Sequence, residues 1–298
     1  MLNGDWRDAQ SPFLCNNSDL LTKNNIYSIM QKGDFMIKFI AADMDGTLLD
    51  SEKRLPPDFE YVLSELNKRG VIFAAASGRQ YETLRREFEH INEKMMIIAE
   101  NGSIVFNGGE NIICEPLEYE KVCEILEKLK EYPNLYPIVC GFDSAYGEKR
   151  NDEVISDVVM YYKKYKTVDN LKEAAKKDKI LKIAVFDPVD AEKNCYPVIK
   201  SFDDDLTVIL SGDKWVDAMK KDISKGSAIR KIREIYGIKK EECAAFGDYM
   251  NDYEMMRECG ESYAMANAYS GLKEVCKYVC KSNDEHGVTE KIKEIFGI

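Results

Sequence analysis

From residue 36 onward, short apolar runs alternate along the chain with segments whose apolar residues recur every three or four positions. The short runs are typical of buried strands, and the longer period is typical of amphipathic helices. Strands that alternate with helices indicate βα units and a parallel sheet. The expected strands are 37–42, 71–76, 95–99, 243–246, 262–268 and 277–280. The expected helices carry apolar positions at Phe59, Val62, Leu63 and Leu66, at Tyr81, Leu84, Phe88 and Ile91, at Ile229, Ile232, Ile235 and Tyr236, and in 287–296, capped near Thr289.

This pattern is interrupted after residue 115. One more amphipathic helix is followed by short strands, segments rich in Tyr and Lys, and many turns, and the alternation returns after about Trp215. We therefore expect an α/β domain made of residues 36–115 and 217–298, with an α+β domain of residues 116–216 inserted into it.

Residues 1–35 have a different character. They are rich in Asn and Asp, show no sustained period, and lack the basic-then-apolar order of a signal peptide. The residues Lys32 to Phe35 can be encoded by a purine-rich sequence containing GGAG, which resembles a ribosome-binding signal upstream of an ATG codon. We expect that Met36 is the native start, and that the leader of residues 1–35 is either wrongly assigned to the protein or disordered.

Composition narrows the class of function. The chain has 42 basic and 53 acidic residues, a formal net charge of -11, whereas nucleic-acid partners select a basic face. This acidic balance leads us to expect no nucleic-acid partner. No apolar run is long enough to span a bilayer, so we also expect no membrane partner. Nine cysteines without a C-x-x-C pair are typical of reduced, packed thiols in a cytoplasmic protein. Two histidines are too few for a His-rich metal site.

Polar motifs follow three of the expected strands and open one of the helices. Asp43 to Thr47 follows the first strand, Ser77 to Arg79 the second, and Gly247 to Asp252 a late one, while Lys225-Gly226 opens a helix. Ligands of open parallel sheets bind at the carboxyl ends of the strands. We therefore expect the four motifs to meet at one edge of the sheet.

A calcium loop is the competing interpretation of the first motif. Counted from Asp43, such a loop needs glycine in sixth place and Glu in twelfth place. Those places hold Leu48 and Arg54, so the pattern fails. A plain Asp-Gly surface turn is possible, but it does not explain why a strongly apolar strand leads into two acids.

The motifs D-x-D-G-T-L, S-G-R, K-G and G-D-x-x-N-D, in this order, resemble those of the haloacid dehalogenase superfamily. The large insertion between the second and third motifs resembles the Cof-type, subclass IIB sugar-phosphatase branch, and the likeness covers about residues 36–298. It implies a Rossmann-like, doubly wound α/β core with an inserted α+β cap. It also implies an Mg²⁺-dependent phosphatase of small phosphorylated metabolites, such as sugar phosphates or phosphorylated cofactors, that works through an aspartyl-phosphate.

The resemblance gives each motif residue a role. Asp43 is the expected nucleophile, Asp45 the expected proton donor and acceptor, and Lys225 the catalytic cation. Two close carboxylates push one pKa upward, which would suit Asp45 to move protons near neutrality. The expected phosphate-binding residues are Met44, Ser77, Gly78, Arg79, Lys225 and Asn251, and the expected Mg²⁺ ligands are Asp43, Asp45 through its carbonyl, Asp248 and Asp252.

Other functions and plainer roles stay open at this point. A phosphomutase of the same superfamily would return the phosphoryl group to its substrate, and a regulatory or binding module could use the same scaffold without catalysis. Asp248 could be only a helix N-cap, Lys225 an ordinary surface lysine, and Asn251 an exposed helix residue.

Overall fold

The structure is a computed structural model, and it describes residues 36–149, 152–202 and 204–298. The expectation that residues 1–35 precede the native start or are disordered lies outside the described residues.

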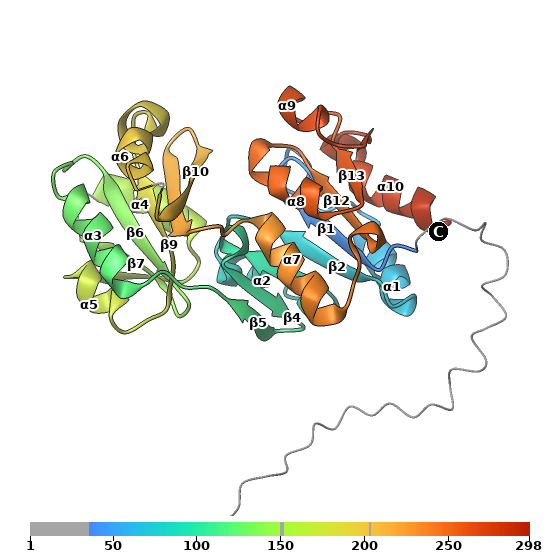
Figure 1. Ribbon diagram of the computed structural model, residues 1–298, viewed down its shortest axis with the longest axis horizontal. Helices are drawn as coiled ribbons and strands as arrows, with labels where there is room; N and C mark the ends of the chain where they lie inside the picture. The colour runs from blue at the N-terminus through green and yellow to red at the C-terminus, as the bar shows by residue number, and fades with distance from the viewer. Residues whose placement is uncertain (1–35, 150–151, 203) are drawn as a thin grey trace, which may run out of the picture. The chain divides into compact units, whose positions relative to one another are not determined.

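The first and last thirds of the described chain together form an eight-stranded sheet (Figure 1). Its strand order is β14-β13-β12-β1-β2-β3-β4-β5, with parallel pairs from β14 to β3 and antiparallel pairs for β3–β4 and β4–β5. The order runs outward from the centre in both directions, so it reverses between β1 and β12. The strands are β1 Phe39–Asp43, β2 Ile72–Ala76, β3 Met96–Ala99, β4 Ile104–Asn107, β5 Glu110–Cys114, β12 Cys243–Gly247, β13 Glu261–Ala264 and β14 Tyr278–Val279.

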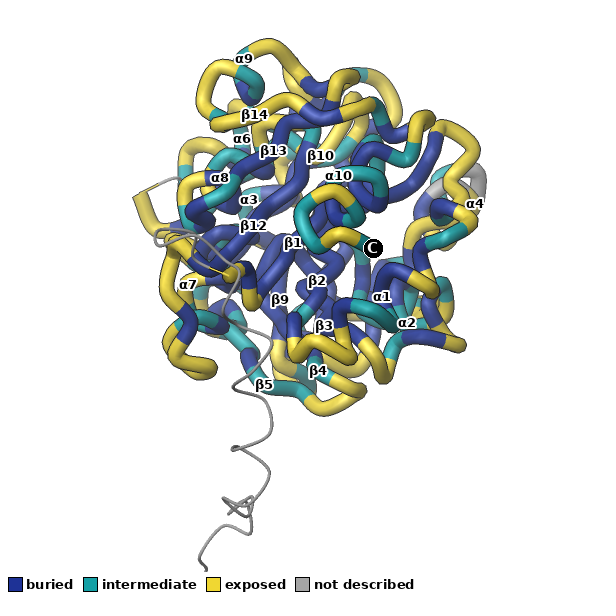
Figure 2. Tube along the Cα trace, turned by 90° about the vertical axis from the view of Figure 1, so that its right-hand side faces the viewer, coloured by how far each residue is buried: buried dark blue, intermediate teal, exposed yellow. Residues whose placement is uncertain are grey.

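Helices cover both faces of this sheet. Ile40 and Ala42 of β1 share a core cluster with residues of α1, α2 and α10, whereas Phe39 and Ala41 share one with residues of α7, α8 and α9. Strands buried on both faces are mostly apolar, and the tube of β1, β2 and β12 is dark blue in Figure 2 except at Ile72, the first residue of β2. These helices are α1 Phe59–Lys68, α2 Tyr81–Glu87, α7 Lys225–Tyr236, α8 Tyr253–Glu258, α9 Ser270–Lys273 and α10 Gly287–Phe296. The expected doubly wound α/β fold is confirmed.

The inserted segment forms a second, six-stranded sheet of order β10-β11-β9-β6-β7-β8, antiparallel except for the β7–β8 pair. Residues of α3, α5 and α6 pack in one core cluster with it, and α4 contributes to another. The expected boundary after residue 216 falls inside β11; a boundary drawn by sheet membership follows Lys220. The elements are α3 Tyr119–Leu129, β6 Tyr136–Gly141, β7 Ala145–Glu148, α4 Asp152–Tyr161, β8 Tyr165–Val168, α5 Leu171–Ala175, β9 Ile180–Phe186, α6 Tyr196–Lys200, β10 Leu206–Gly212 and β11 Trp215–Lys220.

Four details of the predicted elements are wrong. The helix expected to include Phe88 and Ile91 ends at Glu87, although both side chains are buried. The strand expected over 262–268 ends at Ala264, because the chain turns there. Ile235 and Tyr236 are exposed, since the last turn of α7 extends beyond the core. Thr289 does not cap α10, which begins two residues earlier; its hydroxyl instead donates to a backbone carbonyl.

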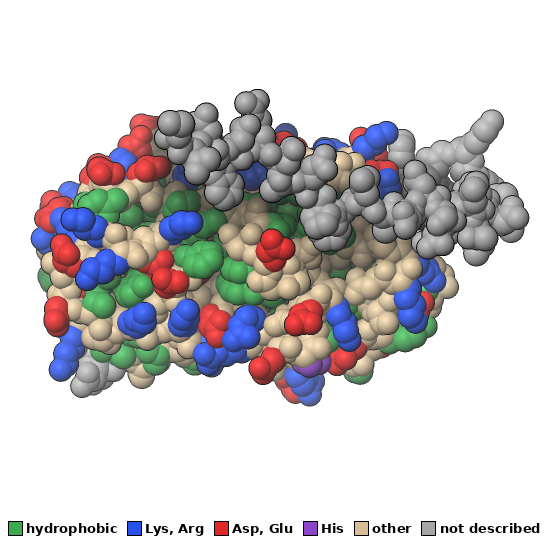
Figure 3. All heavy atoms as spheres, turned by 90° about the horizontal axis from the view of Figure 1, so that it is seen from below, with side chains coloured by type: hydrophobic (Ala, Val, Ile, Leu, Met, Phe, Trp, Pro, Cys, Tyr) green, Lys and Arg blue, Asp and Glu red, His purple; other side chains and the backbone are tan. Residues whose placement is uncertain are grey.

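The structure also bears on the membrane segments, thiols and surface charge considered from the composition. Within the described residues, no helix combines the length and the apolar character needed to cross a membrane. Every cysteine of the described part is a free thiol. Acidic and basic side chains are interspersed on the face drawn in Figure 3. The expected absence of a nucleic-acid partner stays a prediction.

Candidate active site

The first and fourth motifs leave neighbouring strands. Asp43 is the last residue of β1, and Asp248 directly follows β12, which pairs with β1. The strand order of the sheet reverses between these two strands, and open α/β sheets bind ligands at such a point. The motifs therefore lie where the topology predicts a ligand site.

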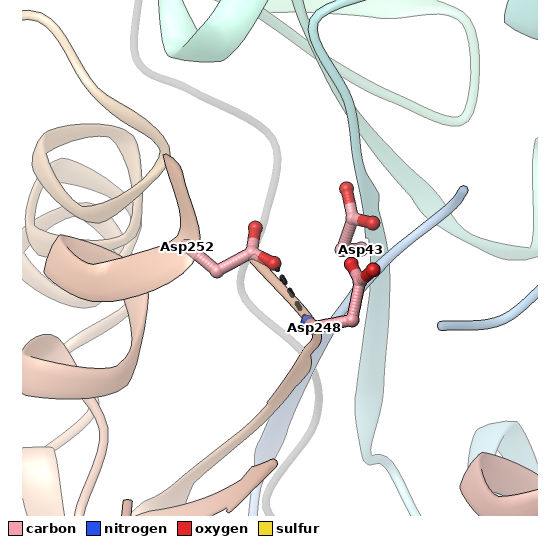
Figure 4. A group of neighbouring side chains, drawn as sticks. All are labelled: Asp43, Asp248 and Asp252. Atoms are coloured by element: carbon pink, nitrogen blue, oxygen red, sulfur yellow. Dashed lines mark hydrogen bonds between the residues drawn. The ribbon is translucent and has the colours of Figure 1, made fainter. Parts of the chain in front are cut away.

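Three carboxylates converge there (Figure 4). Asp43, Asp248 and Asp252 each offer an oxygen, and these oxygens lie within 4.8 Å of one another. Asp252 Oδ2 accepts hydrogen bonds from the backbone N–H groups of Asp248 at 3.0 Å and of Tyr249 at 3.3 Å, which fixes the loop between the acids. The Thr47 hydroxyl donates to Asp248 Oδ1 at 3.2 Å, which links the first motif to the fourth.

Lys225 is the cation of this cluster. Its ammonium donates to Asp43 Oδ1 and, at 2.7 Å, to Asp252 Oδ1. Its side chain is 1% exposed, which excludes an ordinary surface lysine. Ser224 and Ser227 cap α7 reciprocally, each hydroxyl accepting from the other's backbone N–H, so the helix starts at Lys225.

The cluster has an excess of negative charge. Burial raises the pKa of Asp43 well above its usual range; Lys225 opposes this rise, and the other two carboxylates add to it. Burial and then the Asp252 carboxylate raise the pKa of Asp248 to about 6. Burial alone would lower the pKa of Lys225, but Asp252 and Asp43 outweigh it, so the ammonium stays protonated. The site therefore favours additional positive charge.

These residues fit a divalent cation. The converging donors are carboxylate oxygens, and hard ions such as Mg²⁺ prefer oxygen ligands. A dication would offset the negative charge that raises the two pKa values.

Gly46 permits the close approach of the two loops. Its φ is +80°, and a Cβ there would lie 2.4 Å from Asp248 Oδ2. Both the left-handed backbone and the lack of space require glycine.

Asp45 does not join the other carboxylates. Arg79 Nε donates to Asp45 Oδ2 at 2.9 Å, and Lys53 Nζ donates to Oδ1 at 2.7 Å. Burial raises the pKa of Asp45, but the two cations outweigh it and the pKa is lowered. The prediction that a nearby carboxylate raises this pKa is therefore wrong for this arrangement, and the raised pKa belongs to Asp43.

The remaining predicted phosphate ligands differ in placement. Ser77 is buried in the loop after β2, and its Oγ accepts from Arg79 N at 3.1 Å. The Met44 side chain is fully buried in the core, so only its backbone is available to a ligand. Asn251 is half-buried in the 3₁₀ turn Met250–Asp252. No described hydrogen bond joins its side-chain amide to the acidic cluster.

Sequence reasoning missed a second buried group of polar residues. Lys182 of β9 ion-pairs with Glu100 and Asp217, and Asn101 donates to Asp217. The available signal is the run ILKIAVF of Ile180–Phe186, in which a lysine interrupts a fully buried strand. Sequence reasoning also missed Lys53, which is exposed and has no motif around it.

Known proteins resemble the chain over most of its length. The model of the haloacid dehalogenase-like hydrolase family matches residues 40–292. The 5-amino-6-(5-phospho-D-ribitylamino)uracil phosphatase YbjI of Escherichia coli K12 is 30% identical over 266 residues, which cover 87% of this chain and 96% of that protein.

Solved structures give the same result. TM0651 from Thermotoga maritima is 30% identical with a TM-score of 0.76, and the match covers 87% of this chain and 97% of that one. The HAD subclass IIB sugar phosphatase BT4131 is 24% identical with a TM-score of 0.74, covering 88% and 100%, and it shows the shared fold. The chain therefore belongs to the haloacid dehalogenase-like hydrolase family, with the fold of subclass IIB, and it is an enzyme of the phosphatase type.

Proposed function

We propose that the chain is an Mg²⁺-dependent phosphatase of small phosphorylated metabolites and that it works through an aspartyl-phosphate formed on Asp43. The observation that carries this proposal is the convergence of Asp43, Asp248, Asp252 and Lys225 where the strand order reverses, with an excess of negative charge.

Asp43, Asp248, Asp252 and the carbonyl of Asp45 would hold the cation. When bound, it supplies positive charge that offsets the repulsion between a carboxylate and a phosphate dianion. The buried ammonium of Lys225 already contacts Asp43 and adds a fixed positive charge at the same place.

In the first step, an oxygen of Asp43 bonds to phosphorus while the bond from phosphorus to the leaving alcohol oxygen breaks. The alcohol takes a proton from Asp45. Asp45 then takes a proton from the water that attacks the aspartyl-phosphate, which releases inorganic phosphate and restores Asp43. Because Asp45 is paired with Arg79 and Lys53, donation of its proton requires that these contacts open first.

Backbone N–H groups of the first motif can receive the phosphate. Asp43 O accepts from Leu48 N at 3.1 Å, and Met44 O accepts from Leu49 N at 2.9 Å. In a planar trans peptide the N–H points away from the carbonyl. The N–H groups of Met44 and Asp45 therefore point out of the turn, where they can bind phosphate oxygens together with the hydroxyl of Ser77.

The substrate class we propose is a phosphate monoester of a sugar, a sugar alcohol or a cofactor precursor. The name of the Escherichia coli relative gives one member of this class, 5-amino-6-(5-phospho-D-ribitylamino)uracil. This compound and common sugar phosphates form the first panel to screen.

The test is release of inorganic phosphate from that panel with Mg²⁺, for the wild type, for Asp43→Asn and for Asp205→Asn. Asp205 is an exposed acid paired with Lys121 and serves as the matched control. We expect turnover in the wild type and control only. Turnover in Asp43→Asn would refute the nucleophile, and an isomerised product without free phosphate would favour a mutase.

A further inference from the structure

All three carbonyl oxygens of the loop Ser77–Arg79 accept hydrogen bonds, which fix the loop. Two donors are backbone N–H groups of the turn Glu100–Gly102, directly after β3. The third is a side chain from β9 of the second sheet, 104 residues further along the chain. The three hydrogen bonds are Asn101 N to Ser77 O at 3.0 Å, Glu100 N to Arg79 O at 3.1 Å and Lys182 Nζ to Gly78 O at 2.7 Å.

Lys182 is buried together with two acids. Its ammonium lies 2.9 Å from Glu100 Oε2 and 3.2 Å from Asp217 Oδ2, and all three residues are at most 3% exposed. Asp217 Oδ2 also accepts from Asn101 Nδ2 at 3.0 Å and from Ser211 Oγ at 2.8 Å. Removing charges from water is costly, so this group needs an explanation beyond simple packing.

The turn that faces Lys182 is itself strained. Glu100 and Asn101 have φ values of +49° and +55°, in the left-handed region that non-glycine residues rarely adopt. Both oxygens of Glu100 lack a hydrogen bond of good geometry, although Lys182 ion-pairs with one of them. Strain of this kind persists where the surroundings fix a functional conformation.

One peptide group connects Lys182 to a hydroxyl. The Gly78 carbonyl accepts from Lys182, and the N–H of the same peptide, which belongs to Arg79, donates to Ser77 Oγ at 3.1 Å. This N–H occupies one lone pair of the hydroxyl oxygen, and none of the described hydrogen bonds uses the hydroxyl proton, so that proton can be donated to a ligand. A charged donor on the carbonyl polarises the peptide and strengthens its N–H as a donor.

We propose that Lys182 is a positioning residue which, through the Gly78–Arg79 peptide, orients the Ser77 hydroxyl as a donor to the substrate phosphate. The inserted segment thereby sets the geometry of phosphate binding in the core. This inference rests on the proposed function, since the Ser77 hydroxyl needs a phosphate to receive its proton.

A double-mutant cycle tests the inference. Lys182→Met, Ser77→Ala and the double variant are compared with the wild type in kcat, KM and competitive inhibition by inorganic phosphate. We expect Lys182→Met to lower kcat/KM and weaken phosphate inhibition by about tenfold when Ser77 is present, and by less than about twofold in the Ser77→Ala background. Equal losses in both backgrounds would overturn the proposal, because Lys182 would then act through something other than Ser77.

Two further variants sharpen the result. Lys182→Gln retains a neutral donor and should recover part of the loss, and its failure to recover any would also count against the proposed contact. Lys179→Met, at an exposed lysine just before β9, should behave as the wild type.

Folding is checked by circular dichroism and thermal melting. If Lys182→Met does not fold, the pair Lys182→Met with Glu100→Gln removes one charge of each sign, and its cycle with Ser77→Ala decides the question. A wild type that neither turns over the panel nor binds inorganic phosphate with Mg²⁺ refutes the proposed function. An active wild type with an additive cycle refutes only the role of Lys182.

Discussion

Arg79 holds the carboxylate of Asp45 by a hydrogen bond of 2.9 Å from Nε to Oδ2, while Nη1 of the same guanidinium donates to Glu87 Oε2 at 2.8 Å. The acid proposed to donate a proton is therefore kept ionised and turned toward cations. Its neighbour Asp43, two residues earlier, has the raised pKa. Charge partners, more than separation along the chain, decide which acid holds a proton.

Replacing Arg79 by Gln should raise the pKa of Asp45, since burial would then be opposed mainly by Lys53. Asp45 would stay protonated to higher pH. We therefore expect the alkaline limb of the profile of kcat against pH to shift to higher pH, and KM to rise. An unchanged alkaline limb would contradict the proton-donor role. Arg85→Gln, which breaks a pair with Glu82 on the same helix, is the control.

The same substitution has a small effect on stability. Because folding lowers the pKa of Asp45, its pair with Arg79 contributes stability above about pH 4, and this contribution is lost as the pH falls further. The pair is partly exposed, so we expect less than about 1 kcal/mol at neutral pH. Urea unfolding of both proteins at neutral and acid pH measures the difference.

Two glycines allow a matched test of the space beside Asp248. Gly46 and Gly109 have φ values of +80° and +84°, but a Cβ meets Asp248 only at Gly46 and has open space at Gly109. The left-handed backbone should make alanine cost about 1–2 kcal/mol of folding free energy at either position, and the overlap with Asp248 should add to this cost at Gly46. Only Gly46→Ala should lose activity, by about a hundredfold, because Asp248 must move. Equal activities of the two variants would show that Asp248 tolerates displacement.

Mg²⁺ should stabilise the protein more at higher pH. The folded pKa of Asp248 is raised to about 6, so this group favours the folded state below its unfolded pKa, and the benefit is lost as the pH rises through about 6. Mg²⁺ requires the ionised acid, so we expect a larger rise in Tm at about pH 7.5 than at about pH 5. A rise independent of pH, or one reproduced by NaCl of equal ionic strength, would argue against binding at these carboxylates.

Lys225→Met should reduce both activity and stability. It leaves Asp43 and Asp252 buried without their cation, a change that costs about 3–5 kcal/mol. Mg²⁺ should restore part of the lost Tm, because it supplies positive charge to the same acids. Lys231→Met, on the same helix but in a partly exposed pair with Glu115, should cost little. Similar losses in the two variants would weaken the assignment of Lys225.

The sequence predicts elements well where apolar residues are buried by their neighbours along the chain. The four apolar positions expected in α1 are its buried residues, and β1 lies within two residues of its expected start. Prediction fails at Ile235 and Tyr236, because an apolar residue at a helix end is buried only if another element covers it.

The candidate site shows the same division. Motif residues could be found because each loop carries its groups within a few positions. The turning of Asp45 toward Arg79 and Lys53 depends on side-chain direction, and the contact of Lys182 with Gly78 depends on how two sheets meet. Neither property is encoded by local spacing.

The shared burial of Lys182 and Asp217 with Glu100 and Asn101 has a consequence for engineering. The first two residues come from the inserted segment and the last two from the core sheet. A chimaera that joins a foreign cap to this core must supply a lysine and an acid at the positions of Lys182 and Asp217. Without the lysine, the carboxylate of Glu100 would be buried with no cationic partner. The inserted segment of this chain should therefore be exchanged together with the turn Glu100–Gly102 that it contacts.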